Sequence, residues 1–430
     1  MTSSSLMPVR RLWLCAVCAV LTLLSGCGGG TSTSRSAQIP ANCSISIEAL
    51  RPPCPTGVSE SCVTPSCTTS DPTGNACGTL SEPNWNEFKT IAGSSPIHGV
   101  NLAVPWTSID TGQPGTGSSE YDFTALDAQI GYYNTNYPSL KVNLMLIPIS
   151  YSSNGNNPTG GVNYFTPSYV FTSSWAQSVG ASTLDVVTCP ESGYAGNGSP
   201  TSGYPVVYEA PFYKAYENFI QQVIGHYNSG FPNIGYMRFG LSVGDETDAY
   251  CTAEMQALPA PNTFPQTAAP SASFWENYIG MMSNYEKSQA PTFTIMNSLN
   301  SLNTDAGPTL PTFEAQTAVT NGFGFGSNGW QASDIQASQT DPTACTSDWC
   351  ALFDNDYLTG VPLELQPATP SDPSGGGTTG SLVNLVPTAV QNHATILEIA
   401  LPDLYTAFDP NYSPQYYSSY NAALGNACSQ

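Results

Sequence analysis

Short apolar runs alternate with amphipathic stretches over most of the chain, from residue 97 to residue 401. Runs of this length, bounded by glycine and polar residues, are typical of buried β-strands. We predict seven such strands, and a weaker eighth over 184–189 or 204–209, where the seven are 97–106, 141–149, 236–244, 292–299, 322–329, 361–366 and 394–401.

The stretches between these runs have helical spacing. In 212–227 one stripe is apolar and aromatic, and it comprises Phe212, Tyr216, Phe219, Ile220, Val223 and Tyr227. Residues 122–134, 273–288 and 380–393 are also predicted helices, the last one kinked or broken at Pro387. Strands that alternate with helices predict an α/β fold, here a (β/α)8 TIM barrel with long loops. A doubly wound open sheet is the alternative.

The run at 236–246 predicts which side chains face the barrel interior, because successive side chains of a strand point to opposite faces. One face is wholly apolar, with Met237, Phe239, Leu241 and Val243. The other face is small or polar, with Arg238, Gly240, Ser242, Gly244 and Glu246. Glu246 is therefore expected to face inward at the carboxyl end of its strand, where barrel enzymes hold their chemistry.

The same alternation places further polar side chains inside. These are Asn101 and Asn143 on the first two predicted strands, Glu364 and Gln366 on the run at 361–366, and Glu398 on the run at 394–401. A carboxylate within an apolar strand is costly unless it is paired or functional. The glutamates at 246, 364 and 398, with Arg238 as a counter-ion, are therefore a candidate active site.

This layout resembles the large group of (β/α)8 glycoside hydrolases with an acid/base Glu after strand four and a nucleophile Glu on strand seven. "VPWTSID" followed by "EYDFTALDAQI" resembles the first strand and helix of β-galactosidase-type members, and the resemblance spans about residues 95–410. It implies that Glu246 is the acid/base, that Glu364 is the nucleophile with Glu398 as the second choice, and that hydrolysis is retaining. Asp245 stands where the family usually has an Asn that binds the sugar.

The expected substrate contacts are Asn101, Trp106, Asn143, Arg238, Asp245 and Trp330. Indole rings can stack on sugar faces, and Trp175 and Trp349 also fall near predicted strand ends. For each tryptophan, packing is the alternative role.

Two other motifs compete with this interpretation. Residues 240–244 match the G-x-S-x-G of a serine esterase with Ser242 as nucleophile, but a poor helix start follows, and the later His393 precedes a strand. Residues 324–329 match G-x-G-x-x-G, which a glycine-rich barrel strand explains better. A barrel that binds glycans without cutting them is a further alternative.

The N-terminus predicts export. Arg10 and Arg11 precede a short apolar run, and Leu24-Ser25-Gly26-Cys27 resembles a bacterial lipobox. The resemblance implies cleavage before Cys27 and its lipidation, which makes the membrane a partner; Gly28 implies an outer-membrane address. An ordinary signal peptide with an incidental cysteine is the alternative. We predict a signal over 1–26, a tether and Cys-rich extension over 27–80, and the barrel over 81–430.

Composition narrows the partners. The formal charge of −22 disfavours nucleic acid and fits a neutral substrate such as a carbohydrate. Ten cysteines follow Cys27, and in an oxidising compartment we expect them to form disulfides, with Cys345–Cys350 as a local pair. None of these ten cysteines forms a C-x-x-C motif and there are only three histidines, so the sequence implies no metal and no cofactor.

Overall fold

A computed structural model describes residues 45–50, 85–92, 97–112, 121–149, 165–188, 203–242, 244, 246–247, 272–299, 310–330, 352–353, 359–367, 369–377 and 379–427. The predicted signal segment, Cys27, the ten later cysteines, Asp245 and Trp349 lie outside these residues. None of the described helices is long and apolar enough to cross a bilayer.

The described residues form a closed barrel of eight parallel strands. In chain order the strands are β1 (Ser46–Leu50), β2 (Gly99–Pro105), β3 (Lys141–Ile147), β6 (Ile234–Phe239), β7 (Thr294–Leu299), β8 (Gly324–Trp330), β9 (Leu363–Pro367) and β10 (Ile396–Ala400). The barrel closes where β1 pairs with both β2 and β10. The predicted fold class is confirmed, and the open sheet is excluded.

The first barrel strand corrects the predicted domain boundary. β1 lies at 46–50, inside the segment that we expected to be an irregular extension before a barrel starting at residue 81. The weak eighth candidate is not in the barrel, because β4 (Val186–Thr188) and β5 (Gly203–Pro205) form a separate antiparallel pair. The two errors cancel in the count, so β6 is still the fourth barrel strand and β9 the seventh.

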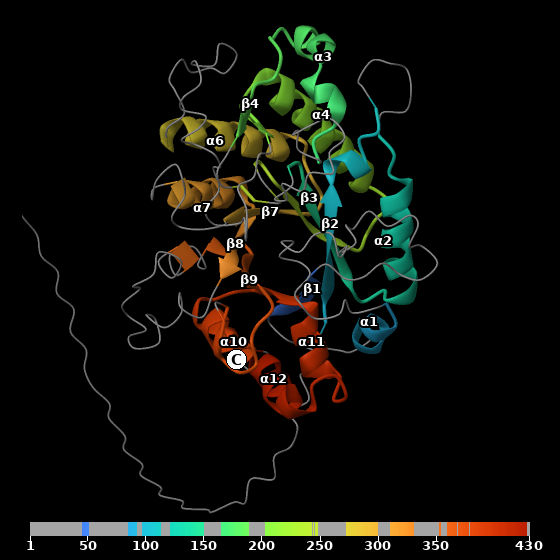
Figure 1. Ribbon diagram of the computed structural model, residues 1–430, viewed down its shortest axis with the longest axis vertical. Coiled ribbons are helices and arrows are strands. Elements are labelled where there is room, and N and C mark those ends of the chain that lie inside the picture. Colours follow the sequence, from blue (N-terminus) through green and yellow to red (C-terminus); the bar gives the residue numbers. More distant parts are fainter. Residues whose placement is uncertain are drawn as a thin grey trace, which may run out of the picture. The chain divides into compact units, whose positions relative to one another are not determined.

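The helices cover the barrel (Figure 1). They are α1 (Trp85–Ala92), α2 (Thr124–Asn136), α3 (Ser173–Ser178), α4 (Ala210–Tyr227), α6 (Ala272–Ser288), α7 (Leu310–Asn321), α10 (Leu382–Gln391), α11 (Leu401–Phe408) and α12 (Pro414–Ala427). Figure 1 shows α6 and α7 side by side, and α10, α11 and α12 grouped together. α10 runs through Pro387 without ending there.

The main core lies between the strands and these helices, as the sequence pattern predicts. The predicted stripe of α4 is buried throughout. Outward side chains such as Leu102 and Val104 on β2 and Leu144 and Leu146 on β3 pack in the same cluster and are inaccessible to solvent. Burial of such side chains contributes roughly 1.5–3 kcal/mol each, so this layer rather than the barrel interior supplies most of the hydrophobic stabilisation.

Candidate functional site

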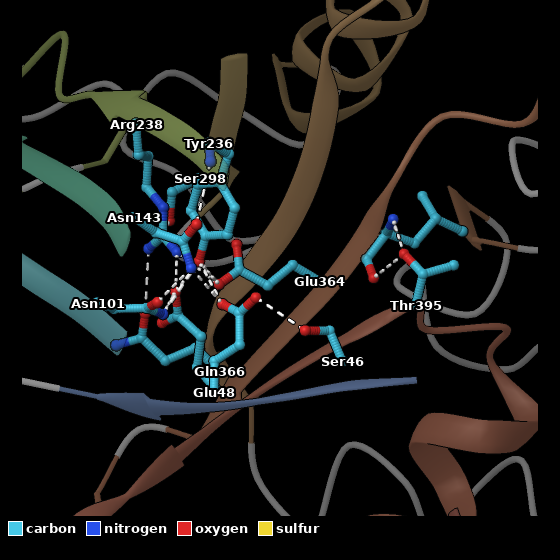
Figure 2. A network of polar contacts seen from close by, with 12 residues as sticks. Ser46, Glu48, Asn101, Asn143, Tyr236, Arg238, Ser298, Glu364, Gln366 and Thr395 are labelled. Carbon is cyan, nitrogen blue, oxygen red and sulfur yellow. Dashed lines mark hydrogen bonds and ion pairs between the residues drawn. The ribbon is translucent and has the colours of Figure 1, made fainter. Parts of the chain in front are cut away.

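The inward side chains of six strands form one buried polar network (Figure 2). Its acidic members are Glu48 on β1, Glu364 on β9 and Glu398 on β10, and its other main members are Asn101, Asn143, Tyr236 and Arg238. Register brings them together, because Glu48 is level with Glu398 and Asn101 is level with Asn143. The predicted inward orientation of the polar residues on these strands is therefore confirmed.

Arg238 is the cation of the network. Its Nη2 lies 2.5 Å from Glu364 Oε1 and also contacts Glu398 Oε1, while its Nη1 donates to Gln366 Oε1 at 3.1 Å. Both Arg238 and Glu398 are inaccessible to solvent. The predicted counter-ion role of Arg238 is thus confirmed, with two carboxyls bound to one nitrogen.

Tyr236 joins the three carboxyls. Its hydroxyl lies 2.6 Å from Glu398 Oε1, 3.1 Å from Glu48 Oε2 and 3.4 Å from Glu364 Oε1. Burial and the neighbouring carboxyls raise the pKa of Tyr236 well above its usual range, so the phenol stays protonated and donates. Neither Tyr236 nor Glu48 was expected at the site from the sequence.

The two asparagines complete the network rather than face a cleft. Asn143 Nδ2 donates to Glu48 Oε2 at 2.9 Å and to Asn101 Oδ1 at 2.7 Å, and Asn101 Nδ2 donates to Tyr236 at 3.0 Å and to Glu398. Both asparagines are inaccessible to solvent. Asn101, Asn143 and Arg238 are thus bound within the network, and their role as substrate contacts stays a prediction.

Small residues make room for this network. A Cβ atom at Gly326 would lie 2.7 Å from Glu364 Cβ, and one at Gly235 would lie 2.2 Å from Asn143 Oδ1. Such distances are too short for any side chain, so glycine is required at both positions. The glycine-rich run at 324–329 is accordingly the barrel strand β8.

Small clusters of apolar side chains flank the network in the barrel interior. Toward the carboxyl ends of β2 and β3, Ala103, Met145 and Ile147 form one cluster with Leu50 and Phe165 packed against it. Toward the amino ends, Tyr236, Met296 and Ile396 form another. Glu364 is 1% exposed and lies second in β9, so its carboxyl is deep in the barrel.

Burial controls the protonation of the acids. It raises the pKa of Glu48 to about 7, with a further contribution from the charge of Glu398. Burial also raises the pKa of Glu364 well above its usual range, although Arg238 opposes the shift. Away from the network, burial raises the pKa of Asp403 on α11 to about 7. At neutral pH the carboxyls of Glu48 and Asp403 are therefore partly protonated.

These shifts predict that the protein loses stability as pH rises. Between pH 4.5, the ordinary pKa of Glu48, and about 7, the folded state binds more protons than the unfolded chain. Glu48 alone lowers the free energy of unfolding by about 3 kcal/mol across this pH window. Thermal unfolding should give a higher Tm near about pH 5 than near about pH 8. The Glu48→Gln variant should show a shallower dependence, and an unchanged slope would contradict this assignment.

Glu246 lies outside the strand that we predicted for it. β6 ends at Phe239, and the described residues that follow it, 240–242, 244 and 246–247, are not part of the strand. We refer to these described residues as the turn. Glu246 is 2% exposed, and its carbonyl accepts the amides of Leu241 at 2.8 Å and Ser242 at 3.4 Å. The residue still follows the fourth barrel strand, at the carboxyl ends of the strands.

Two of the predicted aromatic contacts are core residues. Trp106 is inaccessible to solvent, packs against Phe212, Tyr216 and Phe219 of α4, and donates its indole N–H to Asp110 Oδ2 at 3.1 Å. Trp330 at the end of β8 is 4% exposed and belongs to the same apolar cluster. The packing alternative therefore applies to Trp106 and Trp330, because neither offers an open ring face.

The histidines argue against a serine nucleophile. His98 precedes β2, His226 lies in the last turn of α4 before β6, and His393 precedes β10. All three residues are thus near the amino ends of the strands, whereas Ser242 follows the carboxyl end of β6. A serine nucleophile needs a base within hydrogen-bond distance, and no histidine of this chain is on that side.

Metal ligands are not assembled in the part of the chain described above. No group of three His, Cys, Asp or Glu side chains there has the arrangement to hold a metal ion. The site is therefore described by its carboxyls, amides and one guanidinium.

No protein-family model matches the chain, and no curated protein matches it either. Among solved structures it is similar to the catalytic domain of β-amylase from Paenibacillus polymyxa (TM-score 0.48, 11% identity, 90% of this chain and 99% of that one). It is also similar to a β-galactosidase from Marinomonas ef1 (TM-score 0.46, 10% identity, 89% of this chain and 59% of that one). A third similar structure is a xylanase from Paenibacillus barcinonensis (TM-score 0.45, 12% identity, 92% of this chain and 99% of that one). At these identities and TM-scores, no conclusion about activity follows from the similarity.

Proposed function

We propose that the protein hydrolyses O-glycosidic bonds and that Glu246 is its general acid/base. One observation carries the proposal: a buried carboxyl follows the fourth strand of a closed parallel barrel, on a turn at the carboxyl ends of the strands. Loops at this end carry the chemistry of (β/α)8 enzymes. A carboxyl buried at such a place is costly unless it is paired or functional.

Glycoside hydrolysis needs a second carboxyl, and Glu364 and Glu398 are the candidates. In a double displacement, one of them attacks the anomeric carbon while Glu246 protonates the departing oxygen, and Glu246 then takes a proton from the attacking water. Three donors converge on Glu398 Oε1, from Asn101, Tyr236 and Arg238, and this arrangement stabilises negative charge there. Burial raises the pKa of Glu364, which disfavours it as a nucleophile.

The test is a panel of aryl glycosides and oligosaccharides assayed with the wild type and with the Glu364→Gln and Glu398→Gln variants. We expect the wild type to hydrolyse at least one substrate and the variant of the true nucleophile to lose about a thousandfold or more in kcat. Ser242→Ala is the matched control, and it should retain full activity. An ester-cleaving activity that only Ser242→Ala abolishes would contradict the proposal.

A second candidate function is glycan binding without cleavage. The observation in its favour is the depth of Glu364 and Glu398, both at most 1% exposed and bound to Arg238. Carboxyls that stay enclosed in this way cannot reach an anomeric carbon. Titration calorimetry distinguishes the two functions, because a binding protein takes up an oligosaccharide and releases no product.

The proposal includes a location in a bacterial cell envelope. It depends on the basic and apolar residues before Cys27 and on the resemblance of residues 24–27 to a lipobox. A lipid on Cys27 would hold the barrel at a membrane surface, where an acidic, charge-poor protein can act on neutral glycans.

A further inference from the structure

The turn that carries Glu246 is hydrogen-bonded to neighbours on three sides. The amides of Gly240 and Gly244 donate to the carbonyls of Leu146, at 3.0 Å, and Ile149, at 2.8 Å, which lie on and just after β3. Within the turn, the Leu241 amide donates to the Glu246 carbonyl at 2.8 Å. Gly244 has φ of 69°, a left-handed conformation that favours glycine. These bonds hold Gly240 and Gly244 to the chain on and just after β3, and Leu241 to Glu246.

Tyr278 holds the turn from the helix layer. This residue of α6 is inaccessible to solvent, and its hydroxyl donates to the Leu241 carbonyl at 3.0 Å. Leu241 thus bonds to the Glu246 carbonyl through its amide and to Tyr278 through its carbonyl. Burial raises the pKa of Tyr278 well above its usual range, so the donor is present at any working pH.

Thr247 holds the turn from the barrel. Its amide donates to the Ser298 carbonyl at 2.8 Å, and its hydroxyl accepts the Ser298 amide at 3.2 Å. Ser298 lies on β7, and its own hydroxyl is 3.5 Å from Arg238 Nη1. Thr247, the residue after Glu246, is therefore bonded through its amide and its hydroxyl to β7, a strand that also contacts the interior network.

We propose that Tyr278 and Thr247 are positioning residues, which hold the Glu246 carboxyl in the direction that proton transfer requires. The inference rests on the proposed function of Glu246. Both residues bond to the main chain beside Glu246, so they act through that residue. A displacement of about 1 Å in a reacting group can cost about a hundredfold in rate, so two hydroxyls that fix this turn have a measurable effect on catalysis.

The test compares Tyr278→Phe, which removes the phenol hydroxyl, with Thr247→Val, which replaces the hydroxyl by a methyl group. Both variants keep the shape of the side chain. Each should lower kcat by about tenfold to a hundredfold and change KM by no more than about twofold. The loss should be larger for substrates with poor leaving groups, which depend most on the general acid. Thr247→Ser, which keeps the hydroxyl, should restore kcat. Tyr285→Phe, a half-buried position on the same helix, is the matched control and should behave as wild type.

A second measurement is independent of activity. Amide hydrogen exchange at Leu241, Ser242 and Thr247 should be faster in Tyr278→Phe and in Thr247→Val than in the wild type. Unchanged exchange overturns the inference, and so does unchanged kcat in both variants when Glu246→Gln is inactive. If Glu246→Gln is as active as the wild type, or if the wild type hydrolyses nothing, the proposed function fails and the positioning role fails with it.

Discussion

Arg238→Met is expected to lower the free energy of unfolding by about 3–5 kcal/mol, the largest loss of stability among the variants considered. The guanidinium is fully buried and bound to two carboxyls, and it is the cation that offsets their charge in the network. Without it, Glu364 and Glu398 must take up protons or carry unpaired charge in the barrel. Methionine is unbranched and apolar and fills most of the vacated space.

Urea denaturation at two pH values tests this explanation. Arg238→Met should lower the free energy of unfolding less near about pH 5 than near about pH 8, because protonated carboxyls need no counter-ion. Combining Arg238→Met with Glu364→Gln and Glu398→Gln should recover a large part of the lost stability, since the amides carry no charge. A loss below about 1 kcal/mol for Arg238→Met, typical of an exposed pair, would show that the network does not depend on this cation.

Much of the barrel follows from local patterns. The alternation of apolar runs with helices correctly predicts seven of the eight barrel strands. The alternation of side chains along each strand correctly predicts that four polar residues lie in the interior, namely Glu364, Glu398, Asn101 and Asn143. These predictions succeed because burial on the helix-facing side is a property that each strand carries in its own sequence.

β1 shows where local patterns are insufficient. Its five residues, "SIEAL", lie among prolines and cysteines, and nothing within them distinguishes a barrel strand from an irregular segment. The strand is defined by its partners, since Glu48 is level with Glu398 and with Gly99. Glu48 and the meeting of three carboxyls at Tyr236 depend on this register, which links residues more than 180 positions apart.

Trp106 shows the same limit for side-chain exposure. Its position just after β2 is compatible both with a sugar-stacking loop and with the core. The outcome depends on α4, whose Phe212, Tyr216 and Phe219 surround the indole. Each such aromatic pair contributes about 0.5–1.5 kcal/mol beyond the buried area, so packing is favoured once the helix is in place.

Glu246→Gln is expected to reduce kcat/KM by about a hundredfold to ten-thousandfold on substrates with poor leaving groups, the range for loss of a general acid. The change replaces one oxygen by an NH2 group of similar size, and it leaves in place the main-chain carbonyl of Glu246, which accepts the Leu241 and Ser242 amides. The Tm should therefore stay within a few degrees of the wild type. The measurement is steady-state kinetics on a series of aryl glycosides that differ only in the leaving phenol.

The leaving-group series separates a general acid from a residue that merely binds. A phenolate of low basicity departs without a proton, so Glu246→Gln should hydrolyse activated substrates at a rate closer to wild type and unactivated ones far more slowly. A uniform loss across the series would instead assign Glu246 to substrate binding. A matched loss in Tyr278→Phe, smaller in size but with the same dependence on the leaving group, would indicate that the carboxyl acts only when its turn is held.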